Sequence, residues 1–311
     1  MNTFKETLED FITQCKFQKG LSEQTIRFYT IDLLQFQSII EAKNGSCYVS
    51  QIGRDEIREY LKVIGNFKPK TIKRKVATLK AFFNTLEYED RIVISPFRKL
   101  KIVIKEEKQL PKALNRHEMK SILLEVYKLQ IGKEMQSKHL RFQNSRNIAV
   151  IEMLFATGIR VSELSNLKFE NVDLRFGSVL VNGKGSKERI VYVCSTEALK
   201  ALREYLINLQ EFASDSKYFF VNRLGRKLSD QSIRSMVKAL ASNTNIKLKV
   251  TPHVFRHTFA TLLLENDVDI KYIQSFLGHS SIVTTQIYTH VSKGKQRKIL
   301  LSRHPRKDML N

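Results

Sequence analysis

The chain has 311 residues, with 53 Lys and Arg against 31 Asp and Glu, which gives a formal net charge of +22. This length suggests about two domains of roughly 100–200 residues each, and a hydrophobic share of 42% excludes wholesale disorder. So large a positive charge favours a polyanionic partner, above all nucleic acid, over a protein that is merely basic. The sequence contains no apolar run of about 18 residues and no signal-peptide pattern, so we expect a cytoplasmic, nucleoid-associated protein without membrane contact.

The first hundred residues predict a helical domain. Ser22 is a candidate N-cap, and the residues after it place apolar side chains on one helix face at spacings of three and four. A second helix fits residues 55–61 and a third fits residues 71–86. The side of the third helix away from its apolar face has a cluster of cations, Lys70, Lys73, Arg74, Lys75 and Lys80. The cluster is either a solvated face or a face that contacts phosphates; given the charge of the chain, we expect Lys70, Lys73 and Arg74 to bind DNA.

Residues 104–113 predict a linker between two domains, since they are highly charged and include Pro111. Residues 1–103 hold 18 basic and 12 acidic residues, whereas residues 104–311 hold 35 and 19. We therefore expect a DNA-binding helical domain at 1–103 and a second domain at 114–311 that has most of the excess positive charge.

The sequence of the second domain predicts mostly helices with a small antiparallel sheet. Helices fit residues 115–129 and 148–155, and helices resume near residue 196, whereas the polar stretch 132–146 fits either a loop or a helix extension. Residues 178–182 and 190–194 are short apolar strands around a polar turn, which indicates a β-hairpin. The fold class expected for the whole chain is mainly α. Three widely separated cysteines indicate reduced packing residues and neither disulfides nor a zinc site, Cys15, Cys47 and Cys194.

Candidate catalytic residues are concentrated near the C-terminus of the sequence. Thr251 and Pro252 predict a helix start, which puts His253 and Arg256 on one face of the first turn. Helix N-termini favour anions, and a guanidinium can hold two phosphate oxygens. We expect the adjacent His257 to be a packing residue.

Two upstream motifs add cations. Arg160 follows Gly158 just past an apolar helix, and Glu163 can orient it; a plain surface ion pair is the alternative. Lys184 lies at the hairpin tip, where an ammonium can donate a proton to a leaving oxygen. Lys187 is a rival for that role, and a solvated turn lysine is the alternative for both.

Tyr288 follows His279 by nine residues, in a helix expected to begin near residue 280. A phenol with a pKa near 10 is a poor nucleophile unless cations and a base lie close to it. The basic residues of the preceding motifs supply such groups, so the set suits cleavage of a phosphodiester by a protein nucleophile without a metal.

The sequence lacks the motifs on which other catalytic mechanisms depend. The sequence has no P-loop, no Cys and His set with zinc spacing and no Gly-x-Ser-x-Gly elbow. A two-metal nuclease needs a carboxylate cluster, and the stretch 249–291 offers only Glu265, Asp267 and Asp269, all in one turn between helices.

Four motifs together resemble one family, the tyrosine recombinases or phage-type integrases, and most closely the bacterial Xer recombinases. The motifs are ATGIRVSEL at 156–164, GKGSKER at 183–189, TPHVFRHTFAT at 251–261 and LGHSSIVTTQIYTHV at 277–291. Their order and intervals also agree with the family. The resemblance extends through residues 21–36, which look like the family's first DNA-binding helix.

The resemblance implies a mechanism without cofactor, metal or ATP. Tyr288 would attack the scissile phosphate and form a 3′-phosphotyrosyl bond. Arg160 and Arg256 would hold the non-bridging oxygens, and Lys184 would protonate the leaving 5′-oxygen. A 5′-hydroxyl of a partner strand would then attack the phosphotyrosine, and two such rounds would pass through a Holliday junction.

The resemblance also implies supporting residues and an assembly. His253 and His279 would hydrogen-bond the phosphate and assist proton transfer at Tyr288, while Glu163 would orient Arg160. The expected partner is a double-stranded DNA recombination site, bound by a homo-tetramer on two sites or by a hetero-tetramer with a related recombinase. Residues 293–311 are the candidate segment for docking between protomers.

Several roles remain open at this point. Xer-like resolution of chromosome or plasmid dimers competes with integration or excision of a mobile element. More remote alternatives are a non-catalytic DNA-binding protein and a topoisomerase with the same tyrosine chemistry. The stretch 132–146 looks longer than the usual Xer pattern, and it fits an insertion that touches either DNA or a neighbouring protomer.

Overall fold

The structure is a computed structural model that describes residues 3–106, 112–183, 188–212 and 216–278, without the side chain of residue 133. The chain forms two compact units, Met1–Lys108 and Gln109–Asn311, each of which is considered by itself. The division lies within the stretch 104–113. Within the described ranges, no helix is both long and apolar enough to cross a membrane.

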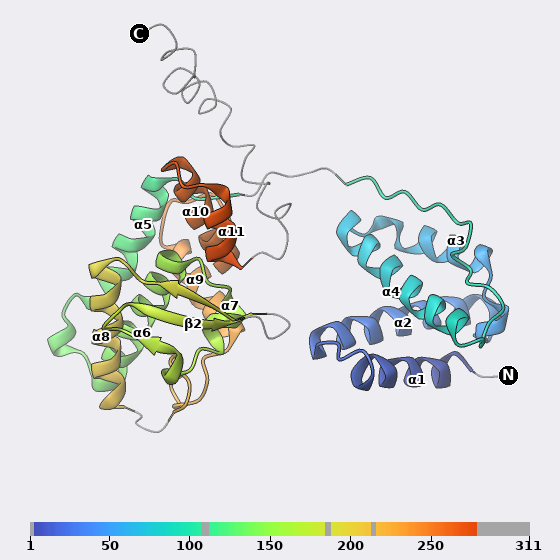
Figure 1. Cartoon of the computed structure of the whole chain (residues 1–311), viewed down its shortest axis with the longest axis horizontal. Helices are drawn as coiled ribbons and strands as arrows, with labels where there is room; N and C mark the ends of the chain where they lie inside the picture. Colours follow the sequence, from blue (N-terminus) through green and yellow to red (C-terminus); the bar gives the residue numbers. More distant parts are fainter. Residues whose placement is uncertain (1–2, 107–111, 184–187, 213–215, 279–311) are drawn as a thin grey trace, which may run out of the picture. The chain divides into compact units, whose positions relative to one another are not determined.

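The first unit is a bundle of helices around an aromatic core (Figure 1). Its α-helices are α1 (Phe4–Phe17), α2 (Glu23–Asn44), α3 (Arg54–Val63) and α4 (Pro69–Tyr88). The Ser22 hydroxyl caps α2 by accepting a hydrogen bond from the Thr25 N–H at 3.3 Å, which confirms the predicted N-cap. The predicted helices at 55–61 and 71–86 are confirmed inside α3 and α4. Phe4, Phe36 and Phe82 are fully buried, and their rings contact one another or neighbouring aromatic rings.

Lys75 does not belong to the exposed cation cluster predicted on α4. Only 5% of the residue is exposed, and its ammonium lies 2.9 Å from the carboxylate of Asp32 on α2. Gln35 is a second acceptor for the ammonium. The helical period places position 75 near the apolar face, and a buried carboxylate supplies the partner that a buried ammonium requires.

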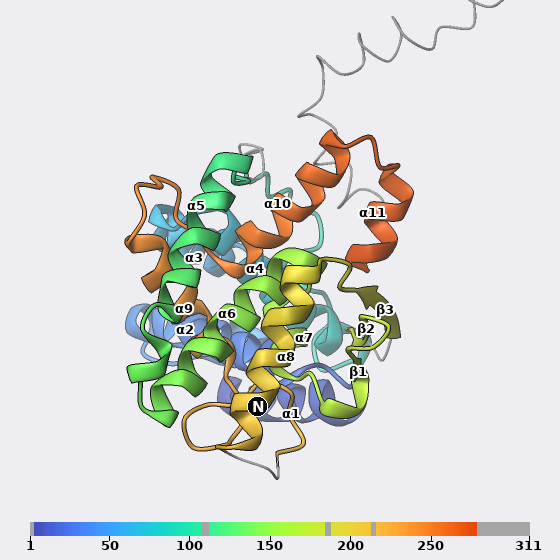
Figure 2. The same ribbon diagram turned by 90° about the vertical axis from the view of Figure 1, so that its left-hand side faces the viewer.

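The second unit is mostly helical, and α6 runs through its core (Figure 2). Its α-helices are α5 (Arg116–Tyr127), α6 (Lys138–Thr157), α7 (Val161–Ser165), α8 (Thr196–Gln210), α9 (Asp230–Ser242), α10 (Pro252–Glu265) and α11 (Ile270–Leu277). α6 packs against α5, α8 and α10. Of the two alternatives for 132–146, the helix extension is correct from Lys138 onward, because Ser137 caps α6 and the helix begins ten residues before the predicted start.

The sheet of this unit has the antiparallel order β1 (Val172–Asp173), β2 (Ser178–Asn182) and β3 (Glu188–Tyr192). Asn182 pairs with Glu188 at one end of the hairpin and Ser178 with Tyr192 at the other. The strand predicted at 190–194 is therefore two residues too late. Polar residues 188 and 189 hid its start, because they pair in the ladder although they lack apolar side chains.

The prediction that the cysteines are packing residues is right for two of the three. Cys15 and Cys47 are buried in the first unit, and burial raises the pKa of the Cys47 thiol to about 12. Cys194 is exposed, just beyond β3, so the packing prediction is wrong there. All three are free thiols.

Candidate active site

Two helix ends meet in the second unit. α6 ends at Gly158 and α11 ends at Gly278, and both glycines adopt the left-handed conformation with φ of 61°. A Cβ atom on Gly158 would lie 2.6 Å from Cδ1 of Phe259 and 3.1 Å from Cδ2 of Leu277. Only glycine therefore fits at this close approach. The carbonyl groups at these two ends are the acceptors around which the site is built.

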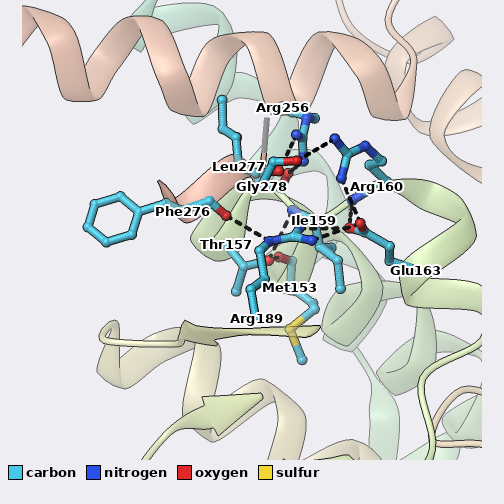
Figure 3. A network of polar contacts seen from close by, with 11 residues as sticks. Met153, Thr157, Ile159, Arg160, Glu163, Arg189, Arg256, Phe276, Leu277 and Gly278 are labelled. Atoms are coloured by element: carbon cyan, nitrogen blue, oxygen red, sulfur yellow. Dashed lines mark hydrogen bonds and ion pairs between the residues drawn. The ribbon is translucent and has the colours of Figure 1, made fainter. Parts of the chain in front are cut away.

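Arg256 bridges the two helix ends (Figure 3). The predicted start of α10 is confirmed, with Thr251 as N-cap and Pro252 as first residue, and Arg256 follows in the helix with 5% of its surface exposed. One terminal nitrogen donates to the Gly158 carbonyl at 2.8 Å, and the other donates to the Leu277 carbonyl. Carbonyls at a helix C-terminus have partial negative charge, so they satisfy and fix the buried guanidinium.

Arg160 approaches the same end of α11 from the start of α7. Its Nη2 donates to the Gly278 carbonyl at 3.0 Å, while its Nη1 donates to Oε1 of Glu163 at 2.7 Å. The backbone N–H of Arg160 donates to Oε2 of Glu163 at 2.9 Å. Since only 4% of the Glu163 side chain is exposed, the alternative of a plain surface pair is wrong. One third of the Arg160 side chain stays exposed, enough to meet a ligand.

Arg189 also belongs to this cluster, although the sequence motifs did not predict it as a site residue. Its two terminal nitrogens donate to the two oxygens of Glu163, each at 2.8 Å, and its Nε donates to the Phe276 carbonyl at 3.0 Å. A signal was available in the sequence. Position 189 has the same parity in the strand as Val191, which is buried, and a cation on the inner face of a strand requires a buried partner.

Glu163 is ionised in this setting. Burial alone would raise the pKa of its carboxyl group, but the hydrogen bonds from Arg189 and from the backbone and side chain of Arg160, together with the charge of Arg189, hold the pKa below its ordinary value. The carboxylate therefore keeps its charge at neutral pH and orients both arginines.

His253 lies in the first turn of α10, at the surface. Partial loss of hydration and the positive charges of Arg234, Arg256 and Arg160 lower the pKa of its imidazole. The ring is therefore neutral at neutral pH and can exchange a proton there. His257 is half-buried, which agrees with a packing role, and burial lowers the pKa of its imidazole as well.

Four predicted site residues lie outside the described ranges, Lys184, Lys187, His279 and Tyr288. Three of them are directly adjacent to described residues in the sequence, and Lys184 directly follows Gly183. β3 begins at Glu188, directly after Lys187, and α11 ends next to Gly278, directly before His279. The catalytic roles of all six predicted residues stay predictions. Among the residues that the structure describes, no three His, Cys, Asp or Glu side chains come together in a way that could hold a metal ion.

The predicted DNA-binding cations of the first unit differ in how they are held. Lys73 lies 2.6 Å and Lys70 3.8 Å from the carboxylate of Glu106. Arg74 pairs with Asp32 and stacks over the ring of Phe28, 4.8 Å from its centroid. Lys70 is the most exposed of the three, with 87% of its side chain accessible, against 46% for Lys73 and 36% for Arg74.

Comparison with known proteins agrees with this architecture. Residues 112–295 match the model of the phage integrase family, and residues 8–90 match the phage integrase N-terminal SAM-like domain. The chain belongs to this family of tyrosine recombinases, so it is a site-specific recombinase.

Two relatives and one solved structure illustrate the similarity. A tyrosine recombinase of Agathobacter rectalis is 42% identical over 308 residues, which cover 99% of each chain. Tyrosine recombinase XerD of Halalkalibacterium halodurans is 37% identical over 314 residues, covering 98% of this chain and all of that one. The post-cleavage complex of XerH recombinase with palindromic difH substrate superimposes with a TM-score of 0.75 at 25% identity, covering 94% of this chain and 83% of that one.

Proposed function

We propose that this recombinase cuts and rejoins double-stranded DNA through a covalent bond to Tyr288. The observation that supports this most directly is the convergence of Arg160 and Arg256 on the carbonyls that close α11, with His253 on the same helix as Arg256. The chain continues from these carbonyls directly into the motif that contains His279 and Tyr288.

The reaction is a transesterification that conserves the number of phosphoester bonds. The Tyr288 oxygen attacks the phosphorus, a bond from phosphorus to Tyr288 forms, and the bond to the 5′-oxygen breaks. The tyrosyl proton passes to a histidine of the site, and Lys184 gives a proton to the departing 5′-oxygen. Attack by a 5′-hydroxyl of the partner strand reverses these steps, so rejoining consumes no outside energy source.

The arginines supply the electrostatic part of catalysis. Arg256 is held by carbonyls of two helices and Arg160 by Glu163 and Gly278, so both guanidinium groups are fixed before a substrate arrives. Preorganised donors of this kind stabilise the charge that develops on the phosphoryl oxygens in the transition state. A neutral His253 fits the proton transfer at Tyr288.

The biological role that fits best is Xer-like resolution of chromosome or plasmid dimers. It is supported by the similarity to XerD over nearly the whole of both chains. In this role the chain acts as a tetramer on two recombination sites, alone or with a related recombinase, and residues 293–311 dock between protomers. Residues 1–103 bind the DNA site with Lys70, Lys73 and Arg74 as phosphate contacts, and Lys187 of the second unit is a further phosphate contact.

A covalent trap tests the chemistry. The full chain is mixed with nicked duplexes from its own locus, without added metal, and run on a denaturing gel. We expect a protein–DNA adduct that disappears in Tyr288→Phe, while that variant still binds the DNA. Sequencing the trapped end gives the cleavage site. Absence of an adduct on every fragment, with tight binding retained, would favour a DNA-binding protein without catalysis.

Two further measurements separate the remaining roles. Stable binding to a short two-fold site fits the Xer-like role, whereas a requirement for distant arm sites would indicate a mobile-element integrase. Relaxation of any supercoiled plasmid by a single protomer would indicate a topoisomerase. Binding should also weaken steeply with salt because many phosphates are neutralised, and a flat response to salt would contradict extensive phosphate contact.

A further inference from the structure

Arg189 joins three elements of the second unit at one point. It originates on β3, holds the carboxylate of Glu163 on α7 with two hydrogen bonds, and donates a third to the carbonyl of Phe276 near the end of α11. Only 13% of its side chain is exposed. The side chain therefore lies under the surface, with most of its donors directed at protein groups (Figure 3).

The contact with α11 is unusually close. A Cβ atom on Gly278 would lie 2.9 Å from Cδ of Arg189 and 3.0 Å from its Nη1. The backbone at the end of α11 thus lies directly against the guanidinium, and this segment accepts hydrogen bonds from Arg160, Arg189 and Arg256 on consecutive carbonyls. A displacement of Arg189 would therefore also displace the carbonyl groups that accept hydrogen bonds from Arg160 and Arg256.

We propose that Arg189 is a positioning residue for strand cleavage, one that fastens the end of α11 to Glu163 and so sets the place of Arg160 and of the carbonyl groups at the end of α11. The inference rests on the proposed function, because the groups it positions are those assigned to the phosphate. Arg189 acts through Glu163 and α11 and does not itself contact the substrate.

An arginine is required for this task. The planar guanidinium grips both carboxylate oxygens and still has Nε for the Phe276 carbonyl, whereas a lysine offers one point charge. Arg189→Lys should therefore keep the charge but lose the fixed geometry, and Arg189→Ala should lose both.

The test is single-turnover cleavage of the nicked duplex that carries the recovered cleavage site, together with the Kd for that duplex. A displacement near 1 Å at a catalytic group costs about a hundredfold in rate, so we expect Arg189→Ala to cleave about a hundredfold more slowly with its Kd for DNA nearly unchanged. Arg189→Lys should fall between Arg189→Ala and the wild type. Arg203→Ala is the matched control, because Arg203 also donates to a backbone carbonyl, that of Leu174 at 2.9 Å, but outside the site.

Two readouts distinguish positioning from a general loss of structure. On a Glu163→Gln background, Arg189→Ala should cost little more, because both act through one network. The acid limb of the rate–pH profile should also move to higher pH in Arg189→Ala, because removing Arg189 raises the pKa of Glu163. Arg160 and Arg189 face Glu163, and α10 adds Arg256 and His253 to the same site.

The possible outcomes distinguish the positioning role of Arg189 from the proposed recombinase chemistry on which it rests. No Tyr288-dependent adduct from the wild type would remove the proposed function. An adduct from the wild type with an unchanged rate in Arg189→Ala would overturn only the positioning role. A weaker Kd for DNA with a salt slope lower by about one would make Arg189 a direct phosphate contact instead. Should Arg189→Ala fail to fold, Arg189→Lys decides, since a wild-type rate and pH profile in that variant would overturn the inference.

Discussion

Each unit of this protein buries one carboxylate between two cations, and the two clusters use their cations differently. In the first unit Asp32 is fully buried on α2 and faces Arg74 and Lys75 on α4. In the second unit Glu163 is nearly buried and faces Arg160 and Arg189. The number of charges is the same, but the remaining donors of the cations have different partners.

Around Asp32 the partners are side chains. Thr78 donates to the carboxylate at 3.1 Å, Gln35 accepts from Lys75, and Phe28 lies under Arg74. Such a cluster joins two helices and fixes their register. Around Glu163 the partners include backbone carbonyls at the end of α11, so that cluster fixes a helix end against a strand and leaves Arg160 partly open to solvent. The cluster around Asp32 therefore stabilises the fold, whereas the cluster around Glu163 holds Arg160 in place to bind a ligand.

Removing the first carboxylate should have the largest effect. Asp32→Ala leaves two cations without their buried partner, which typically costs about 3–5 kcal/mol. We expect the first unit to lose stability by that amount, measured by hydrogen exchange of peptides from α2 and α4 in the full chain. Asp10→Ala is the control, since the pair of Asp10 with Arg91 is largely exposed and worth less than about 1 kcal/mol. An equal loss in both variants would contradict the comparison.

Removing Arg256, which shares the end of α11 with the second cluster, should lower the cleavage rate. Arg256→Ala takes away a preorganised donor to the phosphoryl oxygens, worth on the order of 3 kcal/mol or about a hundredfold or more in cleavage rate. We expect single-turnover cleavage to fall by that factor. Arg203→Ala again serves as control, and cleavage by Arg256→Ala at the wild-type rate would place this arginine outside the chemistry.

The difference between the clusters also explains what the sequence could predict. Local signals were sufficient for the caps at Ser22 and Thr251, the glycine stop at Gly158 and the hairpin. They failed where a partner is distant in sequence. Lys75 looked exposed because Asp32 lies 43 positions away, and Arg189 was passed over because its acceptors lie 26 and 87 positions away.

Two of the C-cap glycines, one in each unit, offer a sharper comparison. Gly45 after α2 and Gly278 after α11 both have positive φ, 73° and 61°, but a Cβ on Gly45 meets nothing within 4 Å. Alanine should cost about 1–2 kcal/mol of stability at either position because of the left-handed conformation. Only Gly278→Ala should also push Arg189 aside and slow cleavage, by about tenfold. Equal cleavage rates in the two variants would show that the close approach of Arg189 has no catalytic consequence.

The smallest expected effect is a dependence of stability on pH, and this dependence should arise in the second unit. Histidine is the side chain that ordinarily titrates between pH 5 and 8, and His253 lies beside the second cluster, whereas the cluster around Asp32 contains no histidine. The pKa of His253 in the folded chain lies below the ordinary value of 6.5, so below about pH 6.5 the unfolded chain binds the proton more readily than the folded chain. Acidification through that range should therefore destabilise the wild type relative to His253→Gln.

Thermal unfolding of the wild type and His253→Gln between pH 5 and 8 measures this difference. The difference in Tm should be constant above pH 7 and should shift in favour of His253→Gln as the pH falls. Solvent screening at the exposed ring keeps the shift small, and a residual slope in the variant should come from His257, whose pKa is lowered by burial. Parallel curves for the two proteins over the whole range would mean that neither partial loss of hydration nor the neighbouring arginines lower the pKa of His253, and its assignment to proton transfer would lose that support.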